Sequence, residues 1–373
     1  MMRMHEITAL ELRLAIEELR PKVIGSYLKK FYDLGSESFR FSFHNAQGNF
    51  VVYCKLGETL NETSFVEESG MATNFAVAVR KRVEDSKVID FYQQGGDRIA
   101  VLEVQGKGRR CRIFIEMFGK GNLIVADENN VIEIAYKIMS YKDREIKPRL
   151  PYVLPKSDAM AIDKMDKEAV EGILAKVSDS GNKTISELSK YLNIGPIYLE
   201  DIIVGAGLNP KDKLGKADMG RLRDAILSFI EKIGAPKPAI YMKDGVIEDY
   251  SVLPLGKYSG LDAQGCSGIN EMLDRISVSG RMAVKDDSVV SNTEEVDAAI
   301  AKQKELVLQF EKDSVDYAKY GKKIFERMGE INELIMWMKE NRRATIDELQ
   351  AKFPGLDIKE LSLKDRTVTI EVD

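Results

Sequence analysis

The stretch YQQGGDRIAVLEVQGKGRRCRIFIEMFGKGNLIVAD, residues 92–127, predicts antiparallel strands joined by glycine turns. Its apolar runs are short, rich in Ile, Val and Phe, and separated by Gly-Lys-Gly sequences, which is typical of hairpins. An acid–base pair, Asp97-Arg98, follows Gly95-Gly96 directly before the first run. The pair is either ordinary turn chemistry or a binding site, and the stretch alone leaves both interpretations open.

The sequence on both sides of this stretch extends the predicted sheet and adds two helices. Alternating, aromatic-rich segments predict further strands at 23–33, 38–43, 49–56 and 131–138. Residues 8–20 predict an amphipathic helix that Pro21 helps to end, with Thr8 and Glu11 at capping-box spacing. Residues 71–85 predict a second helix. Together these elements indicate a mostly antiparallel sheet or sandwich with two helices.

Beyond this region the pattern changes to helices. Residues 141–160 carry three prolines and mixed charge, which favours a linker along the surface. Residues 184–210 predict two helices broken at an Asn-Ile-Gly-Pro turn, the first opening with Thr184 and Glu187 at capping-box spacing. Residues 217–234 predict another helix, and a hairpin is expected around Asp244-Gly245.

A heptad pattern dominates the region after residue 290. Positions alternately four and three apart, from Val296 to Met338, are mostly apolar, which is typical of a coiled-coil seam. Such a long helix needs a partner, and no second heptad run follows. We therefore expect either that the sequence is a fragment or that the partner helix comes from another chain. A short helix and strands are predicted over 344–373.

Composition excludes several classes of protein. No run of about 18 uncharged apolar residues predicts a membrane-spanning helix. The start lacks the apolar stretch of a secretory signal, and three distant cysteines form no disulfide framework, so a cytoplasmic location is expected. Two histidines are too few for a histidine-based metal site, and neither a nucleophile motif nor a phosphate-binding loop occurs. The sequence favours a binding protein over an enzyme, without metal or cofactor.

Charge is unevenly distributed. The net charge is −5, yet residues 80–149 hold 15 Lys and Arg against 11 Asp and Glu. The basic residues have two interpretations, a solvated surface or a phosphate-binding face to which Arg98 would add bidentate contacts. The candidates for contacts to an RNA backbone are Arg80, Arg82, Lys107, Arg109, Arg110 and Arg112.

Several stretches together resemble the amino-terminal part of the NFACT family of ribosome-associated quality-control factors. The matching sequences are ITALELRLAIEELRPKVIGSYLKKFYDL, NFAVAVRKRVED, GGDRIAVLEV followed by RIFIEMFGKGNLIVAD, and YLNIGPIYLEDIIVGAGLNP. The last resembles the helix-two-turns-helix element that this family shares with formamidopyrimidine-DNA glycosylases. The long heptad helix is similar to the coiled-coil arm of the family.

The resemblance implies an α+β fold with four parts. These are a glycosylase-like antiparallel β-sandwich domain with two helices (1–170), a helix-two-turns-helix domain (171–290), a coiled-coil arm helix (291–345) and a small α/β segment at the arm tip (346–373). It also implies binding of tRNA and of the large ribosomal subunit with stalled peptidyl-tRNA, promoting untemplated tailing of the nascent chain. The ribosome would supply the chemistry. The coiled coil would also allow a dimer.

The resemblance assigns tRNA binding to Asp97 and Arg98, with Glu11 at a third acidic position that is usually Asp in the family. Glu11 has an alternative interpretation as a mere capping-box partner. The glycosylases need an amino-terminal Pro-Glu start and a zinc finger, and this chain has neither. A DNA-binding glycosylase-like protein and a fibronectin-binding adhesin remain the alternative functions.

Overall fold

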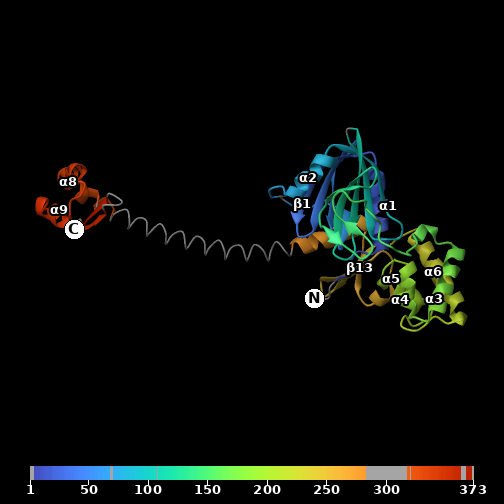
Figure 1. Ribbon diagram of the computed structural model, residues 1–373. Coiled ribbons are helices and arrows are strands. Elements are labelled where there is room, and N and C mark those ends of the chain that lie inside the picture. Colours follow the sequence, from blue (N-terminus) through green and yellow to red (C-terminus); the bar gives the residue numbers. More distant parts are fainter. Residues whose placement is uncertain are drawn as a thin grey trace. The chain divides into compact units, whose positions relative to one another are not determined.

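The computed structural model describes residues 4–67, 70–106, 108–282, 317–319, 321–362 and 367–371. The chain divides into two compact units, Met1–Met282 and Ala283–Asp373. The first unit contains the sheet, the helices α1–α6 and a small second sheet, and the second contains α8 and α9 (Figure 1). The fold is α+β with a large antiparallel sheet, as the sequence predicts.

Helix α1 (Ala9–Val23) begins with the predicted capping box. The Thr8 hydroxyl accepts from the Glu11 backbone N–H, and the Glu11 carboxylate accepts from the Thr8 N–H. The helix does not stop before Pro21 but runs two residues further. Pro21 lies in the last turn, where the missing N–H removes a single intrahelical hydrogen bond, so it is tolerated there.

Nine strands form one antiparallel sheet in the order β4-β3-β2-β1-β5-β6-β7-β8-β9. Each predicted strand is present, with some shift of its ends. Two strands, β4 and β5, were not predicted. The bounds are β1 (Tyr27–Gly35), β2 (Ser38–Asn45), β3 (Gly48–Lys55), β4 (Thr59–Glu62), β5 (Ser86–Gln93), β6 (Ile99–Gly106), β7 (Arg109–Glu116), β8 (Asn122–Asp127) and β9 (Ile132–Ala135).

The sheet bends onto itself between β1 and β5. These strands share only the pairs Tyr27↔Lys87 and Leu28↔Ser86, so the halves on either side diverge. Their inner faces meet: the rings of Phe39 and Tyr136 lie 4.9 Å apart. The predicted sandwich is therefore a single folded sheet with an apolar interior. Helix α1 packs against β4, β5 and β6, and α2 (Asn74–Val83) packs against β1, β6 and β9.

The segment predicted as a surface linker is packed against the outer face of the sheet. Arg144, Ile146 and Tyr152 are all buried, and β11 (Glu145–Ile146) within it pairs with β10 (Met139–Ser140), which directly precedes the segment. Most of the segment is exposed and runs along the surface as predicted, but it is anchored there. The Arg144 guanidinium has a buried partner: its nitrogens lie 2.6 and 3.1 Å from the two carboxylate oxygens of Glu116. Local composition cannot reveal such a long-range partner.

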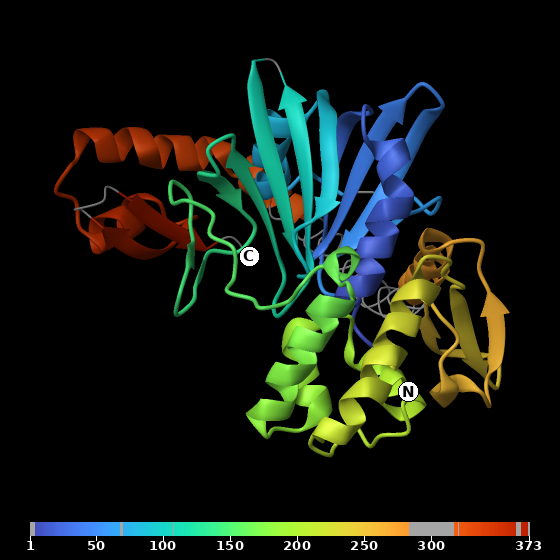
Figure 2. The same ribbon diagram turned by 90° about the vertical axis from the view of Figure 1, so that its right-hand side faces the viewer.

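Four helices follow and lie together below the sheet (Figure 2): α3 (Lys167–Ser180), α4 (Thr184–Tyr191), α5 (Pro196–Gly205) and α6 (Met219–Ile233). The capping box expected at Thr184 is absent. Lys183 is the N-cap, and the Thr184 hydroxyl donates instead to the carbonyl of Asp212 at 2.8 Å. The turn between α4 and α5 contains Gly195 at φ +105°, and an added Cβ would meet the Thr8 methyl at 2.3 Å. Short 3-10 turns span Ile162–Lys164 and Lys216–Asp218.

A three-stranded sheet completes the first unit. Its strands are β12 (Ala239–Lys243), β13 (Val246–Ser251) and β14 (Asp262–Gly265), with a 3-10 turn at Gly256–Tyr258. The predicted hairpin is present, with Asp244 and Gly245 both at positive φ, as a two-residue turn requires. Residues 269–282 are helical.

The second unit is small. Helix α8 (Met328–Glu340) and helix α9 (Ile346–Lys352) pack with a hairpin of β15 (Asp357–Ser362) and β16 (Thr367–Glu371) around a separate apolar cluster. The short helix and strands predicted over 344–373 are thereby confirmed. The first part of the predicted heptad seam, from Val296 through residue 316, lies outside the described residues, as does the expected domain boundary at 290. No helix within the described ranges is long and apolar enough to span a membrane.

Candidate nucleic-acid interface

The loop between β5 and β6 holds Asp97 and Arg98 in a tightly bonded turn. Gly95 has φ +59°, a conformation that favours glycine. The Gln94 N–H donates to the Ile99 carbonyl, and the Ile99 N–H donates to the Asp97 carbonyl, both at 2.9 Å. The turn is thus fixed by its backbone, and the acid–base pair projects from its rim.

Arg98 reaches across to the segment that precedes α1. Its Nη1 donates to the Glu6 carboxylate at 3.0 Å and to the Ile7 carbonyl at 3.1 Å. The side chain is 22% exposed. Neither Nη2 nor Nε has a partner among the described residues, so the outer edge of the guanidinium can still bind a phosphate or a base edge.

Asp97 is held from the opposite side. The Ser157 hydroxyl donates to its Oδ1 at 2.8 Å. Burial raises the pKa of the Asp97 carboxyl, and the hydrogen bond from Ser157 partly offsets this. The two members of the pair therefore have different partners, one from residues after the sheet and one from residues before α1. They do not neutralise each other.

The loop also contacts the helical region. The Asn193 amide donates to the Gly96 carbonyl at 3.2 Å, and the Met160 N–H donates to the Tyr191 carbonyl at 3.0 Å. The pair consequently lies where the large sheet, the residues before α1 and the end of α4 meet. A ligand bound at Asp97 and Arg98 would be presented to elements from both regions of the first unit.

Glu11 is fully buried, unlike the other two candidates. Its Oε1 accepts from the Tyr198 hydroxyl at 2.6 Å and lies 2.9 Å from His5 Nε2. The other ring nitrogen of His5 lies 2.6 Å from Asp249. Burial disfavours the charged imidazole, but Glu11 and Asp249 outweigh it and raise the pKa of His5 to about 9.

Three of the six candidate basic residues already form ion pairs within the fold. Arg82 and Arg109 both contact the Glu133 carboxylate on β9. Arg112 donates to Glu103 at 2.8 Å. These ion pairs partly neutralise the charge of the three guanidinium groups toward a ligand.

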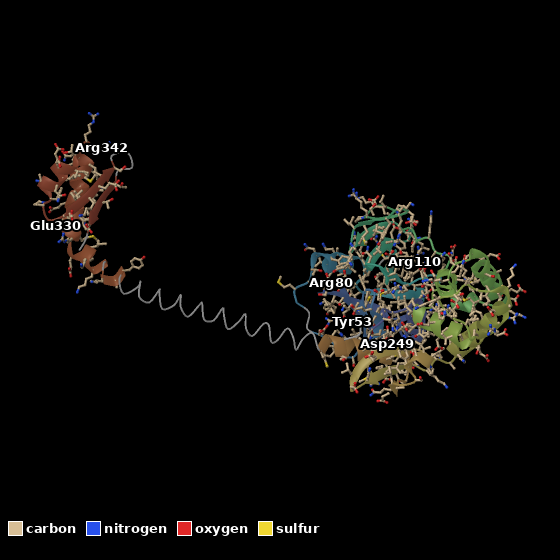
Figure 3. The ribbon with its side chains drawn as sticks, turned by 90° about the horizontal axis from the view of Figure 1, so that it is seen from below. Tyr53, Arg80, Arg110, Asp249, Glu330 and Arg342 are labelled. Atoms are coloured by element: carbon tan, nitrogen blue, oxygen red, sulfur yellow. The ribbon has the colours of Figure 1, made fainter. Side chains whose placement is uncertain are left out.

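Three candidates remain. Arg80 donates to the Phe31 carbonyl at 2.7 Å and lies 5.0 Å from the Tyr32 ring. Arg110 is exposed and has no hydrogen bond or ion pair with any residue that the structure describes. Figure 3 labels Arg80 and Arg110, which come from α2 and β7. Lys107 lies outside the described residues.

Sequence reasoning missed the residues that hold the pair in place. Ser157 and Asn193 lie 60 and 97 positions along the chain from their partners in the loop, and Asp249 lies 244 positions from His5. No local motif signals such contacts. His5 precedes the predicted N-cap Thr8 by three residues, and a histidine at that position is too common to indicate a function.

Over the residues described, no three His, Cys, Asp or Glu side chains are grouped so as to hold a metal ion. The loop offers the guanidinium of Arg98 as a hydrogen-bond donor and the carboxylate of Asp97 as an acceptor.

The family model of the NFACT N-terminal and middle domains matches residues 8–351. The chain belongs to the NFACT family. The match spans the sheet, α1 to α6, the loop with Asp97 and Arg98, and α8 of the second unit.

Two curated relatives carry quality-control names. The archaeal Rqc2 homolog aRqcH of Methanocaldococcus jannaschii is 22% identical over 280 residues, covering 72% of this chain and 42% of the relative. Ribosome quality control complex subunit 2 of Schizosaccharomyces pombe is 26% identical over 139 residues, covering 36% of this chain and 13% of the relative. The chain thus spans less than half of the length of these relatives.

Two solved structures have folds similar to that of this chain. The fibrinogen binding protein of Staphylococcus aureus has a TM-score of 0.59 at 17% identity, covering 72% of this chain and 98% of that chain. The N-terminal part of the fibronectin/fibrinogen-binding protein of Streptococcus suis has a TM-score of 0.58 at 16% identity, covering 73% and 99%. At this identity the likeness shows the fold alone.

Proposed function

We propose that this chain is part of a ribosome-associated quality-control factor. In this role it binds tRNA and the large ribosomal subunit that carries stalled peptidyl-tRNA, and it promotes untemplated tailing of the nascent chain. The support is its family and the names of its relatives, which are quality-control subunits rather than enzymes. We assign no catalytic residue, because the peptidyl transfer belongs to the ribosome.

The observation that carries the proposal is the geometry of Asp97 and Arg98. Both side chains are partly exposed, both are held from one side, and each retains polar atoms that no described residue contacts. An arginine held in this way loses little further rotamer entropy when it binds a phosphate or a base edge. Asp97 accepts hydrogen bonds, and a base amino group is a suitable donor.

The finer architecture is part of the same proposal. The turn of Gly195 between α4 and α5 suits a helix-two-turns-helix element, which would offer a second nucleic-acid contact beside the loop. We propose that residues 1–170 and 171–290 form two domains. We also propose that residues 291–345 form a coiled-coil arm that contacts the ribosomal subunit or a second copy of the chain.

Equilibrium binding of tRNA to three variants tests the proposal. Arg98→Ala and Asp97→Ala should each weaken binding by roughly 5- to 150-fold, the range for losing one specific polar contact of about 1–3 kcal/mol. The matched control is Arg20→Ala. Arg20, like Arg98, donates to one carboxylate and one backbone carbonyl, those of Asp90 and Phe91.

Parent-like tRNA affinity in a folded Arg98→Ala variant contradicts the site assignment. Duplex DNA of the same length serves as a competitor, and preference for the duplex would contradict tRNA as the ligand. Co-sedimentation with large subunits that bear peptidyl-tRNA, compared with empty subunits, tests the ribosomal part of the proposal.

A further inference from the structure

A polar cluster, His5–Glu11–Asp249, joins four segments of the first unit; Glu11 is fully buried, and the His5 and Asp249 side chains are 15% exposed. Glu11 comes from α1, His5 from the residues before it, and Asp249 from β13 (Figure 3). Tyr198 of α5 donates to Glu11 through its hydroxyl, and that same oxygen accepts from the Val252 N–H at 3.1 Å. Every member of the cluster thus has a hydrogen-bond partner, as buried polar groups require.

The histidine at the centre of the cluster is fixed on three sides. Its ring nitrogens face Glu11 and Asp249, and its face stacks on the Tyr250 ring with the centroids 4.2 Å apart. Asp249 is itself held by the Tyr258 hydroxyl and by the Tyr250 N–H. A doubly protonated imidazole donates to both carboxylates at once, so it links α1 to β13.

The segment from His5 to Thr8 leads from this cluster to Arg98. Its first residue is held by Glu11 and Asp249, and the N–H of its last residue donates to Glu11 at 2.8 Å. The two residues between these ends supply the partners of Arg98, namely the Glu6 carboxylate and the Ile7 carbonyl. Both ends of the short stretch that grips Arg98 are therefore anchored in the cluster.

We propose that His5, Glu11 and Asp249 are positioning residues that fix the His5–Thr8 segment and through it aim Arg98 at the RNA. This inference rests on the proposed function and changes one part of it. Glu11 has no exposed surface, so it contributes to tRNA binding through Arg98 and not by touching the RNA.

The inference can be tested because loss of positioning and loss of a negative charge change the tRNA affinity in opposite directions. Asp249→Asn removes a negative charge, and long-range electrostatics alone would strengthen the binding of a polyanion. Loss of positioning weakens it. The matched control is Asp262→Asn, which removes the same charge from β14 of the same small sheet. Asp262 is exposed and has no hydrogen bond or ion pair with a described residue.

The experiment measures tRNA affinity at one salt concentration for the parent, Asp249→Asn, Asp262→Asn, Arg98→Ala and the double variant of Arg98 and Asp249. We expect Asp249→Asn to bind roughly tenfold more weakly than the parent, and the same change to have no further effect when Arg98 is absent. Asp262→Asn should bind no more weakly than the parent. The inference is overturned if Asp249→Asn and Asp262→Asn change the tRNA affinity equally. It is also overturned if Asp249→Asn weakens binding as much in the Arg98→Ala variant as in the parent.

Amide hydrogen exchange provides a readout that needs no ligand. In Asp249→Asn the peptide covering residues 4–10 should exchange about tenfold faster than in Asp262→Asn, because the Thr8 N–H depends on the cluster for its protection. Unchanged exchange overturns the inference even if tRNA binds. If the parent protein binds no tRNA, the proposed function is contradicted. If amide exchange is nevertheless faster in Asp249→Asn, the cluster still anchors the His5–Thr8 segment.

A milder variant covers the case in which Asp249→Asn does not fold, as shown by loss of a cooperative thermal transition. Tyr258→Phe removes only the hydroxyl that donates to Asp249. It should accelerate exchange of the same peptide and weaken tRNA binding, and the absence of both effects overturns the inference.

Discussion

Gly96 lies so close to Met160 that a Cβ added to the glycine would stand 2.7 Å from the Met160 carbonyl oxygen. That oxygen belongs to the backbone, so it cannot rotate away as a side chain would. Gly96→Ala should therefore displace the loop that carries Asp97 and Arg98. We expect a loss of about 1–3 kcal/mol in the free energy of unfolding, the usual cost of overpacking, measured by urea denaturation, together with weaker tRNA binding.

Gly260→Ala is the matched control for this prediction. Gly260 has no positive φ, and a Cβ there would meet nothing within 4 Å. It should change the stability by less than about 0.5 kcal/mol, as surface substitutions usually do. Equal stability of the two alanine variants would show that the close approach of Gly96 and Met160 does not matter.

Stability should fall as the pH rises from neutral to alkaline, because of His5. The pKa of His5 is raised from 6.5 to about 9 in the folded state. A raised pKa contributes stability that is fully present below 6.5 and is lost as the pH rises through about 9. The loss amounts to as much as about 3 kcal/mol, from 1.36 kcal/mol per pKa unit. Urea unfolding at pH 6, 7.5 and 9.5 measures it.

A variant without the histidine isolates this contribution. His5→Gln should be less stable than the parent at pH 6, and its stability should be flatter between pH 6.5 and 9. The other charged or titratable groups that face the ring or its partners are Glu11, Tyr198, Asp249, Tyr250, Lys257 and Tyr258. A parent-like slope in His5→Gln would assign the pH dependence to other groups.

The buried ion pair of Glu116 and Arg144 makes a further prediction. The two side chains are only 1% and 3% exposed. Glu116→Gln leaves the Arg144 charge buried without a counterion, which should cost about 3–5 kcal/mol in urea unfolding. The double variant Glu116→Gln/Arg144→Met should recover part of this loss.

The exposed pair of Lys55 and Glu58, with 37% and 56% of each side chain accessible, gives the control for the buried pair. Glu58→Gln should change the stability by less than about 1 kcal/mol. If Glu116→Gln lowers the free energy of unfolding by as little as Glu58→Gln does, water must reach the Arg144 guanidinium.

Local patterns predicted most of the fold. Alternation and glycine turns located β6, β7 and β8, and the helical period located the buried face of α6. The sequence failed for β5, which only two residues separate from α2 and which has a register irregularity between Val88 and Asp90 that breaks its alternation. It also failed for Arg144, whose charge suggested an exposed linker.

The site could be predicted only in part. The Gly-Gly turn before Asp97 and Arg98 is visible in the sequence, and the structure confirms the need for glycine at both positions. The basic residues around it are equally visible, but the sequence cannot show that Arg82 and Arg109 share Glu133. Such pairings are set by the register of β7, β8 and β9 and by the packing of α2 against β9, and so they follow from the fold and not from the charge pattern.

This difference between paired and unpaired arginines leads to a prediction about salt dependence. Arg110 is exposed and has no described partner, whereas Arg112 donates to Glu103 and to Asn130. If Arg110 contacts a phosphate, Arg110→Ala should weaken binding to all tRNAs alike and reduce the slope of log K against log salt by about 1. Arg112→Ala should leave the slope nearly unchanged. A parent-like slope in Arg110→Ala, or a larger change in Arg112→Ala, would show that ion pairing in the free protein does not decide which arginines the RNA uses.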